Sequence, residues 1–590
     1  MSADHDSPSW QRYLTIAFIL LAVVLVVRGL QGAVEAGWFT IVQDQWGIYD
    51  QLLHEPGWDG VLGSHNGHRT TVPRLFFLAD LFVFGGHNIF LTVVGLLLAA
   101  ASVAALLLPL RAASQMPGWV RIIAGCFLCM FWFWLRNIRI LCHGNESVHA
   151  YLVTLGLAVG AVLVARGQSA LRAGETPSVT GAVLLACCCF VGTFSFGVGI
   201  VLWPAFLITL AVLKFPRTWL LVLVAPFVAT LFAYMFLLPG SDEVGRQLGF
   251  APTRTVPDTC MWVGSPAYFI AAEWWAALFG TETPAILRSV AGAVGLCMIG
   301  GVIVATLRLL RVRREAYPLE AAFVPVTLFG VGCGALIALG RVKHLGEVPE
   351  GIIAVRYQVW TSVLWSGAAV LLAHYLWVIR ATRRLQRVWI VGVCLLALLF
   401  VPQAVTAPSY YAAQARGHER AALGILVGVE DDAEVRAGLG MNPAIAYRVR
   451  PTLQEHGASV FAWPEASWLS RVVRLPTADS ENASAGVVTQ ITPVSNEGTR
   501  FEGWAVIPPS QAAAAIVVAV DANDRVVGVA RMTEERPDVA RHLGIGHARI
   551  GFFGYYMLEP GQVTPRFVAF PDLRDHPSNK GLLLEVATHR

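Results

Sequence analysis

The sequence has little charge and no strong excess of either sign. Charged residues make up 14% of its 590 residues, whereas a soluble domain carries roughly 25%. The formal net charge of +4 is too small to indicate a nucleic-acid partner. Ten cysteines are few for this length and the glycines have no period, which excludes a disulfide scaffold and collagen. There is no Walker A or dinucleotide-binding glycine pattern, so a cytoplasmic nucleotide is not the expected fuel.

Long hydrophobic runs are what the sequence does contain. Hydrophobic residues make up 56% of the chain, and the mean hydropathy is +0.59. Runs close to the ~20 residues that cross a bilayer predict a polytopic α-helical membrane protein with about eleven transmembrane helices. The predicted spans are 13–30, 89–110, 119–137, 149–166, 179–195, 198–213, 218–238, 284–308, 319–340, 358–379 and 388–405. The first span lacks the small-residue cleavage site of a signal peptide, so we expect it to be retained.

Lysine and arginine placement predicts the orientation of these helices. Every second connection is basic, and the positive-inside rule places those connections, with the N-terminus, in the cytoplasm. The basic residues concerned are Arg111, Arg166, Arg172, Lys214, Arg217, Arg308, Arg311, Arg313, Arg314, Arg380, Arg383, Arg384 and Arg387. Nearly all the non-helical mass then lies outside, in loop 31–88, in loop 239–283 and in the C-terminal region.

The C-terminal region divides by composition and periodicity into two parts. Residues 406–475 predict a helical extracytoplasmic connector, and residues 476–590 a β-sandwich-like extracytoplasmic domain that follows a polar linker. The predicted strands are Ile516–Val520, Arg525–Arg531, Arg566–Phe570 and Leu582–Ala587. Five aromatic residues of this domain could either stack on sugar rings or form its core. They are Trp504, Phe552, Phe553, Tyr555 and Tyr556.

The first external loop holds the richest set of candidate functional residues. Three aspartates, Asp44, Asp50 and Asp59, precede the run His65-Asn-Gly-His68-Arg69. Residues 72–86 then predict an amphipathic helix at the membrane interface. A charge near the bilayer has to be paired or functional, because burying it alone costs several kcal/mol.

Two histidines of this loop raise the question of a metal. His65 and His68 are three residues apart and follow Asp59, which leaves a divalent cation as an open alternative. The intervening Asn66-Gly67 favours a turn, and therefore a role in hydrogen bonding or phosphate contact over a zinc site. The residues demand no cofactor, and we predict no metal ligands.

Two further external connections carry polar side chains. Glu146 lies in a short loop near Arg136 and Arg139, at the mouth of the predicted bundle. The last connection places Lys343 and the pair Arg356-Tyr357 outside, against the positive-inside trend. An anionic ligand at the outer interface would explain this exception, and pairing with a structural carboxylate is the alternative.

This combination of features resembles the GT-C superfamily of integral-membrane glycosyltransferases, which use polyprenyl-phosphate sugars. The features are a many-helix bundle, an acidic first external loop, interfacial helices and an external β-domain like that of bacterial arabinosyltransferases. The resemblance implies residues 1–405 as a catalytic membrane domain, with loop 31–88 as its external loop. It also implies the bacterial inner membrane, with the C-terminus periplasmic.

The resemblance further implies roles for individual residues. Asp44 is the best match to the catalytic base of the superfamily and Asp50 the next, although the two are not adjacent as in the usual acidic pair. The donor phosphate would be bound by Arg69, His68, Lys343 and Arg356. Orientation of the acceptor would fall to Asp59, His65, Glu146 and Tyr357.

The expected reaction is an inverting transfer of a sugar from a polyprenyl-phosphate donor to an envelope glycan, a glycolipid or an exported protein. Two other classes stay open. A lipid-linked glycan polymerase or ligase, or an acyltransferase, would use the same external Arg and His residues with a different donor. A transporter of lipid-linked sugars would require charges within the helices and two related halves, and neither is evident.

Overall fold

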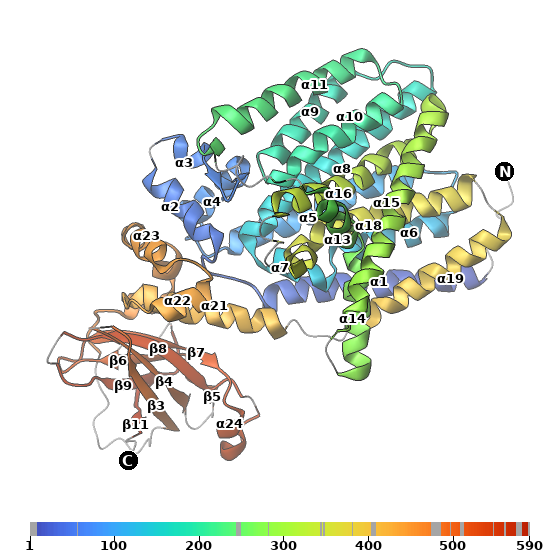
Figure 1. Cartoon of the computed structure of the whole chain (residues 1–590). Helices are drawn as coiled ribbons and strands as arrows, with labels where there is room; N and C mark the ends of the chain where they lie inside the picture. The colour runs from blue at the N-terminus through green and yellow to red at the C-terminus, as the bar shows by residue number, and fades with distance from the viewer. Residues whose placement is uncertain are drawn as a thin grey trace, which may run out of the picture. The chain divides into compact units, whose positions relative to one another are not determined.

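The computed structural model in Figure 1 forms two compact units. The first unit comprises Met1–Gly37, Pro56–Phe76 and Leu91–Pro408, and the second comprises Trp38–Glu55, Phe77–Phe90 and Ser409–Arg590. The structure describes all residues except 1–8, 56, 243–248, 250, 281–282, 343–344, 346–348, 380–381, 403–408, 474–484, 496, 508–511, 547, 560–561, 574–580 and 588–590. The predicted first external loop is therefore divided between the units.

Helices make up most of the first unit. Eight helices of the described part are long and apolar enough to cross a membrane, which confirms a multi-pass helical membrane protein. They are Ser9–Glu35, Ile89–Ala112, Gly118–Cys142, Gly144–Arg172, Arg217–Leu237, Ile286–Glu315, Pro318–Gly340 and Val355–Val378. The expected count of eleven is not confirmed, because Val179–Thr193 and Gly197–Val212 are shorter apolar helices and the helix Arg383–Leu399 has only 17 residues.

The elements of this unit include the parts of those spans and the shorter elements between them. In chain order they are α1 (Ser9–Glu35), α3 (Asp59–Leu62), β1 (Ser64–His65), β2 (His68–Arg69), α5 (Ile89–Ala112), α6 (Gly118–Trp132), η1 (Leu135–Asn137), α7 (Ile138–Cys142), α8 (Gly144–Arg172), α9 (Val179–Thr193), η2 (Gly197–Val201), α10 (Leu202–Val212), α11 (Arg217–Phe232), η3 (Ala233–Leu237), α13 (Pro252–Val263), α14 (Ser265–Phe279), α15 (Ile286–Val312), η4 (Arg313–Glu315), α16 (Pro318–Gly340), η5 (Pro349–Ile353), η6 (Val355–Tyr357), α18 (Gln358–His374), η7 (Tyr375–Ile379) and α19 (Arg383–Leu399). Helix α4 (Thr71–Val83) confirms the helix predicted at 72–86, and it contributes to both units.

Close helix packing forms the core of the first unit. Helix α8 is largely enclosed by α9 and α16, and Figure 1 shows α8, α9, α10 and α11 side by side. Helix α13 packs against α15 and α16, and its Trp262 is fully buried. At this crossing a Cβ on Gly264 would lie 1.8 Å from the carbonyl oxygen of Ala291, so only glycine fits. Trp262, which falls in the predicted external loop 239–283, is thus a core residue.

Short helices and one curled sheet form the second unit. The helices are α2 (Asp44–His54), α21 (Ser409–Val427), α22 (Asp432–Leu439), α23 (Pro443–Glu455), η8 (Ser459–Ala462), η9 (Pro464–Trp468) and α24 (Pro537–Leu543). The strands are β3 (Ala485–Pro493), β4 (Gly498–Ile507), β5 (Ala512–Ala513), β6 (Ile516–Val520), β7 (Val526–Glu534), β8 (Gly551–Met557), β9 (Arg566–Phe570), β10 (Leu582–Leu583) and β11 (Glu585–Val586). They match the four predicted strand segments, so the strand-rich C-terminal domain is confirmed.

The nine strands form one sheet. Their order is β10-β9-β6-β7-β8-β4-β3-β11, with β5 paired to β4, and all pairs are antiparallel except β11 with β3. Strands β4 and β9 are far apart in this order, yet the rings of Phe501 and Phe567 on them are 4.8 Å apart. The sheet therefore curls so that strands near its two ends face each other. The packing is like that of a sandwich, although all the strands belong to one sheet.

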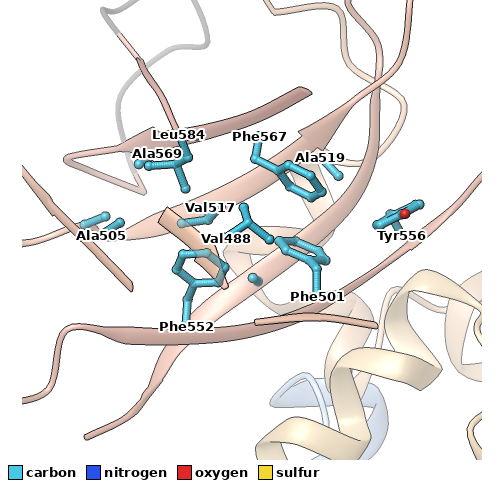
Figure 2. Packing of buried hydrophobic residues seen from close by; sticks show 12 residues of the cluster. Val488, Phe501, Ala505, Val517, Ala519, Phe552, Tyr556, Phe567, Ala569 and Leu584 are labelled. Carbon is cyan, nitrogen blue, oxygen red and sulfur yellow. The ribbon is translucent and has the colours of Figure 1, made fainter. Parts of the chain in front are cut away.

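The interior of the curled sheet contains two of the five aromatic residues that the sequence marked. Figure 2 shows Phe552 and Tyr556 packed beside Phe501 and Phe567, and both are buried. The neighbouring Phe553 and Tyr555 alternate to the other face of β8 and are also fully buried. Burial of these four side chains rules out their stacking on sugar rings from solvent.

The connector helices cover that other face of the sheet. Helix α21 packs on β7 and β8, and the Arg420 guanidinium lies 4.0 Å above the ring of Phe553. The Tyr555 hydroxyl donates a 2.9 Å hydrogen bond to Asp431, the N-cap of α22. Connector and sheet consequently form one packed body.

Candidate functional site

A cluster of arginine residues in the first unit begins just after the end of α6. Helix α6 ends at Trp132, and the fully buried Asn137 caps its end. The amide nitrogen of Asn137 donates to the carbonyl oxygens of Phe131 at 2.8 Å and Trp132 at 3.2 Å, and to Ser362 at 3.2 Å. The chain then turns through η1 and α7, which carry Arg136 and Arg139.

Two of the arginines in this cluster have carboxylate partners. Arg139 forms a bidentate contact with Glu146 in the first turn of α8, with Nε 2.9 Å from Oε2. The ring of the buried His143 lies 3.6 Å from the same glutamate. Arg136 binds Glu273 on α14 and lies 5.1 Å above the ring of Phe269. These pairs neutralise two of the arginine charges.

Arg356 is the third arginine of the cluster. Its element, η6, packs against both η1 and α7. The guanidinium lies 5.0 Å above the ring of the buried Tyr357, and the buried Nε atom has no hydrogen-bond partner among the described residues. Within the same part of the chain, no carboxylate forms an ion pair with Arg356. The structure therefore does not support, for these residues, the alternative of a structural carboxylate partner.

The electrostatics of the cluster favour an anion. Three guanidinium groups lie on packed elements at one end of the bundle, and the two glutamates balance only two of them. A partly buried arginine without a partner is costly, and a guanidinium matches the geometry of phosphate oxygens. We call Arg136, Arg139, Arg356, Glu146 and Glu273 the arginine cluster. It could bind the phosphate of a ligand that enters from the bundle end.

The two loop histidines flank a hairpin turn, as the sequence predicted. Asn66 and Gly67 have φ of 49° and 72°, and His65 pairs with His68 across strands β1 and β2. The ring of His68 lies 4.6 Å from that of Phe196, which also faces His149 at 5.9 Å. His68 therefore packs in an aromatic group. Among the described residues, no group of three or more His, Cys, Asp or Glu side chains could bind a metal ion.

Arg69 is fully buried, and most of its hydrogen bonds go to the backbone, with one to the Ser241 hydroxyl at 2.9 Å. All three guanidinium nitrogens donate to oxygens near the π-helical turn η3. Such a turn leaves carbonyl groups without a partner inside the helix, and these groups accept from Arg69. The distances are 3.0 Å to Tyr234, 3.1 Å to Leu238, 2.7 Å to Pro239 and 2.8 Å to Leu62. This geometry favours a structural role for Arg69 over the expected contact with donor phosphate.

The predicted acidic residues lie in different surroundings. Asp44 is the exposed first residue of α2, and Asp50 binds Arg448 on α23 and His54, both within the second unit. Asp59 is the exposed first residue of α3 in the first unit. Lys343 lies outside the described residues.

Glu273 and Arg448 are the partners that sequence reasoning missed. Glu273 is 137 residues from Arg136, and Arg448 is 398 residues from Asp50, so no local pattern signals either pair. A scan against protein-family models and a search of curated proteins found no match.

Proposed function

We propose that this chain is a membrane glycosyltransferase that takes a sugar from a polyprenyl-phosphate donor. The observation that carries the proposal is Arg356, which is partly buried, stacked on Tyr357 and without a carboxylate partner in the described structure. An anion from outside the protein would stabilise such a group at the end of an apolar bundle. A lipid phosphate supplies that anion at this depth, because its tail would stay in the bilayer.

The location of the arginine cluster supports a reaction outside the cytoplasm. Helix α8 runs from Glu146 beside the cluster to Arg172, a length of about 40 Å, and it therefore spans the bilayer. Arg172 belongs to the basic rim that includes Arg308 and Arg314. Because basic rims face the cytoplasm, the arginine cluster would face the opposite side, which is the periplasm of a bacterial inner membrane.

The proposed reaction is a single displacement with inversion. An acceptor hydroxyl oxygen attacks the anomeric carbon, the bond from that carbon to the phosphate oxygen breaks, and polyprenyl phosphate leaves with the electron pair. Arg356, with Arg136 and Arg139, would stabilise the leaving phosphate. A carboxylate takes the proton of the hydroxyl. Asp44 is our candidate for this base, on the sequence resemblance and its exposed carboxyl group.

The test is product analysis by mass spectrometry with a panel of polyprenyl-phosphate sugars. We expect the wild type to release polyprenyl phosphate, and Asp44→Asn to do so at least about a hundredfold more slowly with the donor KM unchanged. Arg356→Ala should raise the donor KM by about 10- to 100-fold, since it removes a charge-assisted contact. Arg311→Ala is the matched control, because it removes an exposed arginine from the basic rim.

Three results would contradict parts of the proposal. An unchanged donor KM in Arg356→Ala would remove Arg356 from the phosphate site. Full turnover by Asp44→Asn would discard Asp44 as the base. Consumption of a lipid-pyrophosphate glycan or an acyl donor, but of no lipid-monophosphate sugar, would replace the reaction class with a polymerase, ligase or acyltransferase.

A further inference from the structure

The backbone just before α2 is strained and is held by the connector. Gln43 has a φ of 50°, a left-handed value that costs a non-glycine residue on the order of 1–3 kcal/mol. Its N–H donates a 2.8 Å hydrogen bond to the carbonyl oxygen of Leu439, the last residue of α22. Gly440 follows with a φ of 63°, and a Cβ there would lie 3.3 Å from Gln43 Cγ. The end of α22 thus fixes the residue that precedes Asp44.

A charge pair holds the middle of the same helix. Asp50 accepts hydrogen bonds from Arg448 of α23 through both carboxylate oxygens, with Nε 2.8 Å from Oδ1. His54, one turn further along α2, lies 2.9 Å from Oδ1 of Asp50. Both carboxylate oxygens of Asp50 contact neighbouring side chains, so this residue can attach α2 to the connector. We call Asp50 the tether. The Asp50–Arg448 pair therefore fixes α2 against the connector.

Two further contacts attach the loop segments to the connector. The ring of the buried Trp38 lies 4.5 Å from that of His418 on α21, nearly perpendicular to it. The carbonyl oxygen of Gly85 accepts a 2.7 Å hydrogen bond from the N–H of Ser459. Segments 38–55 and 77–90 are thus held at several points by helices more than 300 residues later in the chain.

We propose that the connector helices α21–α23 position α2, and through it the carboxylate of Asp44, for the transfer reaction. Arg448 and the Leu439-Gly440 turn are the positioning residues, and Asp50 is the tether on the loop side. This inference rests on the proposed function, in which Asp44 takes the acceptor proton. It assigns the C-terminal region a role in the chemistry of the first external loop.

The size of the expected effect follows from catalytic geometry. A shift of about 1 Å in a reacting group costs up to about a hundredfold in rate. Loss of the tether should therefore lower kcat and leave the donor KM unchanged, because Arg448 contacts Asp50 and is not one of the proposed phosphate-binding residues. A contact that only stabilised the fold would lower the amount of folded protein and leave the kcat of that protein unchanged.

Charge reversal across the pair tests this inference. Asp50→Arg and Arg448→Asp should each lower kcat about 10- to 100-fold and raise amide hydrogen exchange in residues 43–55. The double variant restores the opposite charges, so both readouts should return to within about threefold of the wild type. Arg436→Ala is the matched control, since that side chain is 67% exposed and pairs only weakly with Asp432 on its own helix. The unfolding midpoint of each variant separates loss of position from loss of fold.

The outcomes separate this inference from the proposed function. Restored exchange protection without restored turnover in the double variant would show that Asp50 itself performs chemistry, which overturns the tether. Unchanged kcat and unchanged exchange in the single reversals would overturn it as well. If the wild type consumes no donor, the proposed function fails, and the exchange measurement alone decides whether Arg448 holds α2.

Discussion

The buried position of Asp80 makes the stability of this protein depend on pH. Its side chain is fully buried in the second unit, Oδ2 accepts a 3.2 Å hydrogen bond from the N–H of Asn88, and Oδ1 has no partner in the described structure. Burial raises the pKa of the Asp80 carboxyl to about 7, and the hydrogen bond from Asn88 only partly offsets this effect. Ionised Asp80 therefore destabilises the folded state.

The sign of the pH dependence follows from that direction. Because the pKa is raised in the folded state, protonated Asp80 stabilises folding fully below about pH 4, and this stabilisation is lost as the pH rises through about 7. Asp80→Asn keeps the acceptor for Asn88 and removes the charge. We expect its free energy of unfolding, relative to the wild type, to increase from pH 4 to pH 7 by up to about 4 kcal/mol. Unfolding curves across this range measure the difference, and a constant difference would exclude a buried charge at Asp80.

At the scale of elements, the π-helical turn η3 depends on a side chain from another part of the chain. The turn ends α11, and the carbonyl oxygens of Tyr234, Leu238 and Pro239 accept hydrogen bonds from Arg69 of the β1–β2 hairpin. A helix end within a membrane protein needs such donors, because lipid offers none. The hairpin and α11 are therefore coupled.

Replacing Arg69, the hydrogen-bond donor at this helix end, should lower the free energy of unfolding of the first unit. Arg69→Met removes a side chain that serves four backbone carbonyls, so we expect a loss of more than about 3 kcal/mol. Arg217→Met, at the exposed start of the same helix α11, is the control and should change stability by less than about 0.5 kcal/mol. Thermal unfolding in lipid nanodiscs measures both. A raised donor KM with wild-type stability would instead assign Arg69 to the phosphate site.

At the scale of the whole molecule, the curled sheet shares its core and its hydrogen bonds with the connector. The N–H of Val526 donates to the carbonyl oxygen of Arg471 at 2.8 Å, and the Ser470 N–H donates to that of Val526 at 2.9 Å. Arg531 of β7 lies 3.8 Å above the ring of Trp463 and binds the buried Glu465. The sheet is therefore a structural part of the second unit.

This arrangement predicts the result of a truncation. Deletion of residues 487–590 would expose the face of α21 that packs on β7 and β8, and would leave Glu465 without Arg531. We expect residues 38–55 and 409–468 to lose hydrogen-exchange protection, and kcat to fall with them. A truncated protein with wild-type protection and turnover would instead make the sheet an accessory module.

Local patterns in the sequence predicted most helices and strands, but fewer of the residues that pair with one another in space. The Asn66-Gly67 turn, the helix at 72–86 and the strands Ile516–Val520 and Arg566–Phe570 were predicted because each depends on neighbours in the chain. The transmembrane count was less accurate, because apolar length alone does not distinguish a span from a short buried helix such as α9. The donor and acceptor residues of the proposed reaction remain predictions.

The sequence by itself determined the membrane-spanning helices, the strand-rich C-terminal domain and the charged residues of the loops, because composition and periodicity are local properties. Only the tertiary structure decided which of those charges have partners. It placed Arg69 on backbone carbonyls, Asp50 on Arg448 and Glu146 on Arg139, and it left Arg356 without a carboxylate in the described part of the chain. Those pairs join residues from distant elements, and the free energy of a charge depends on the groups that surround it in space.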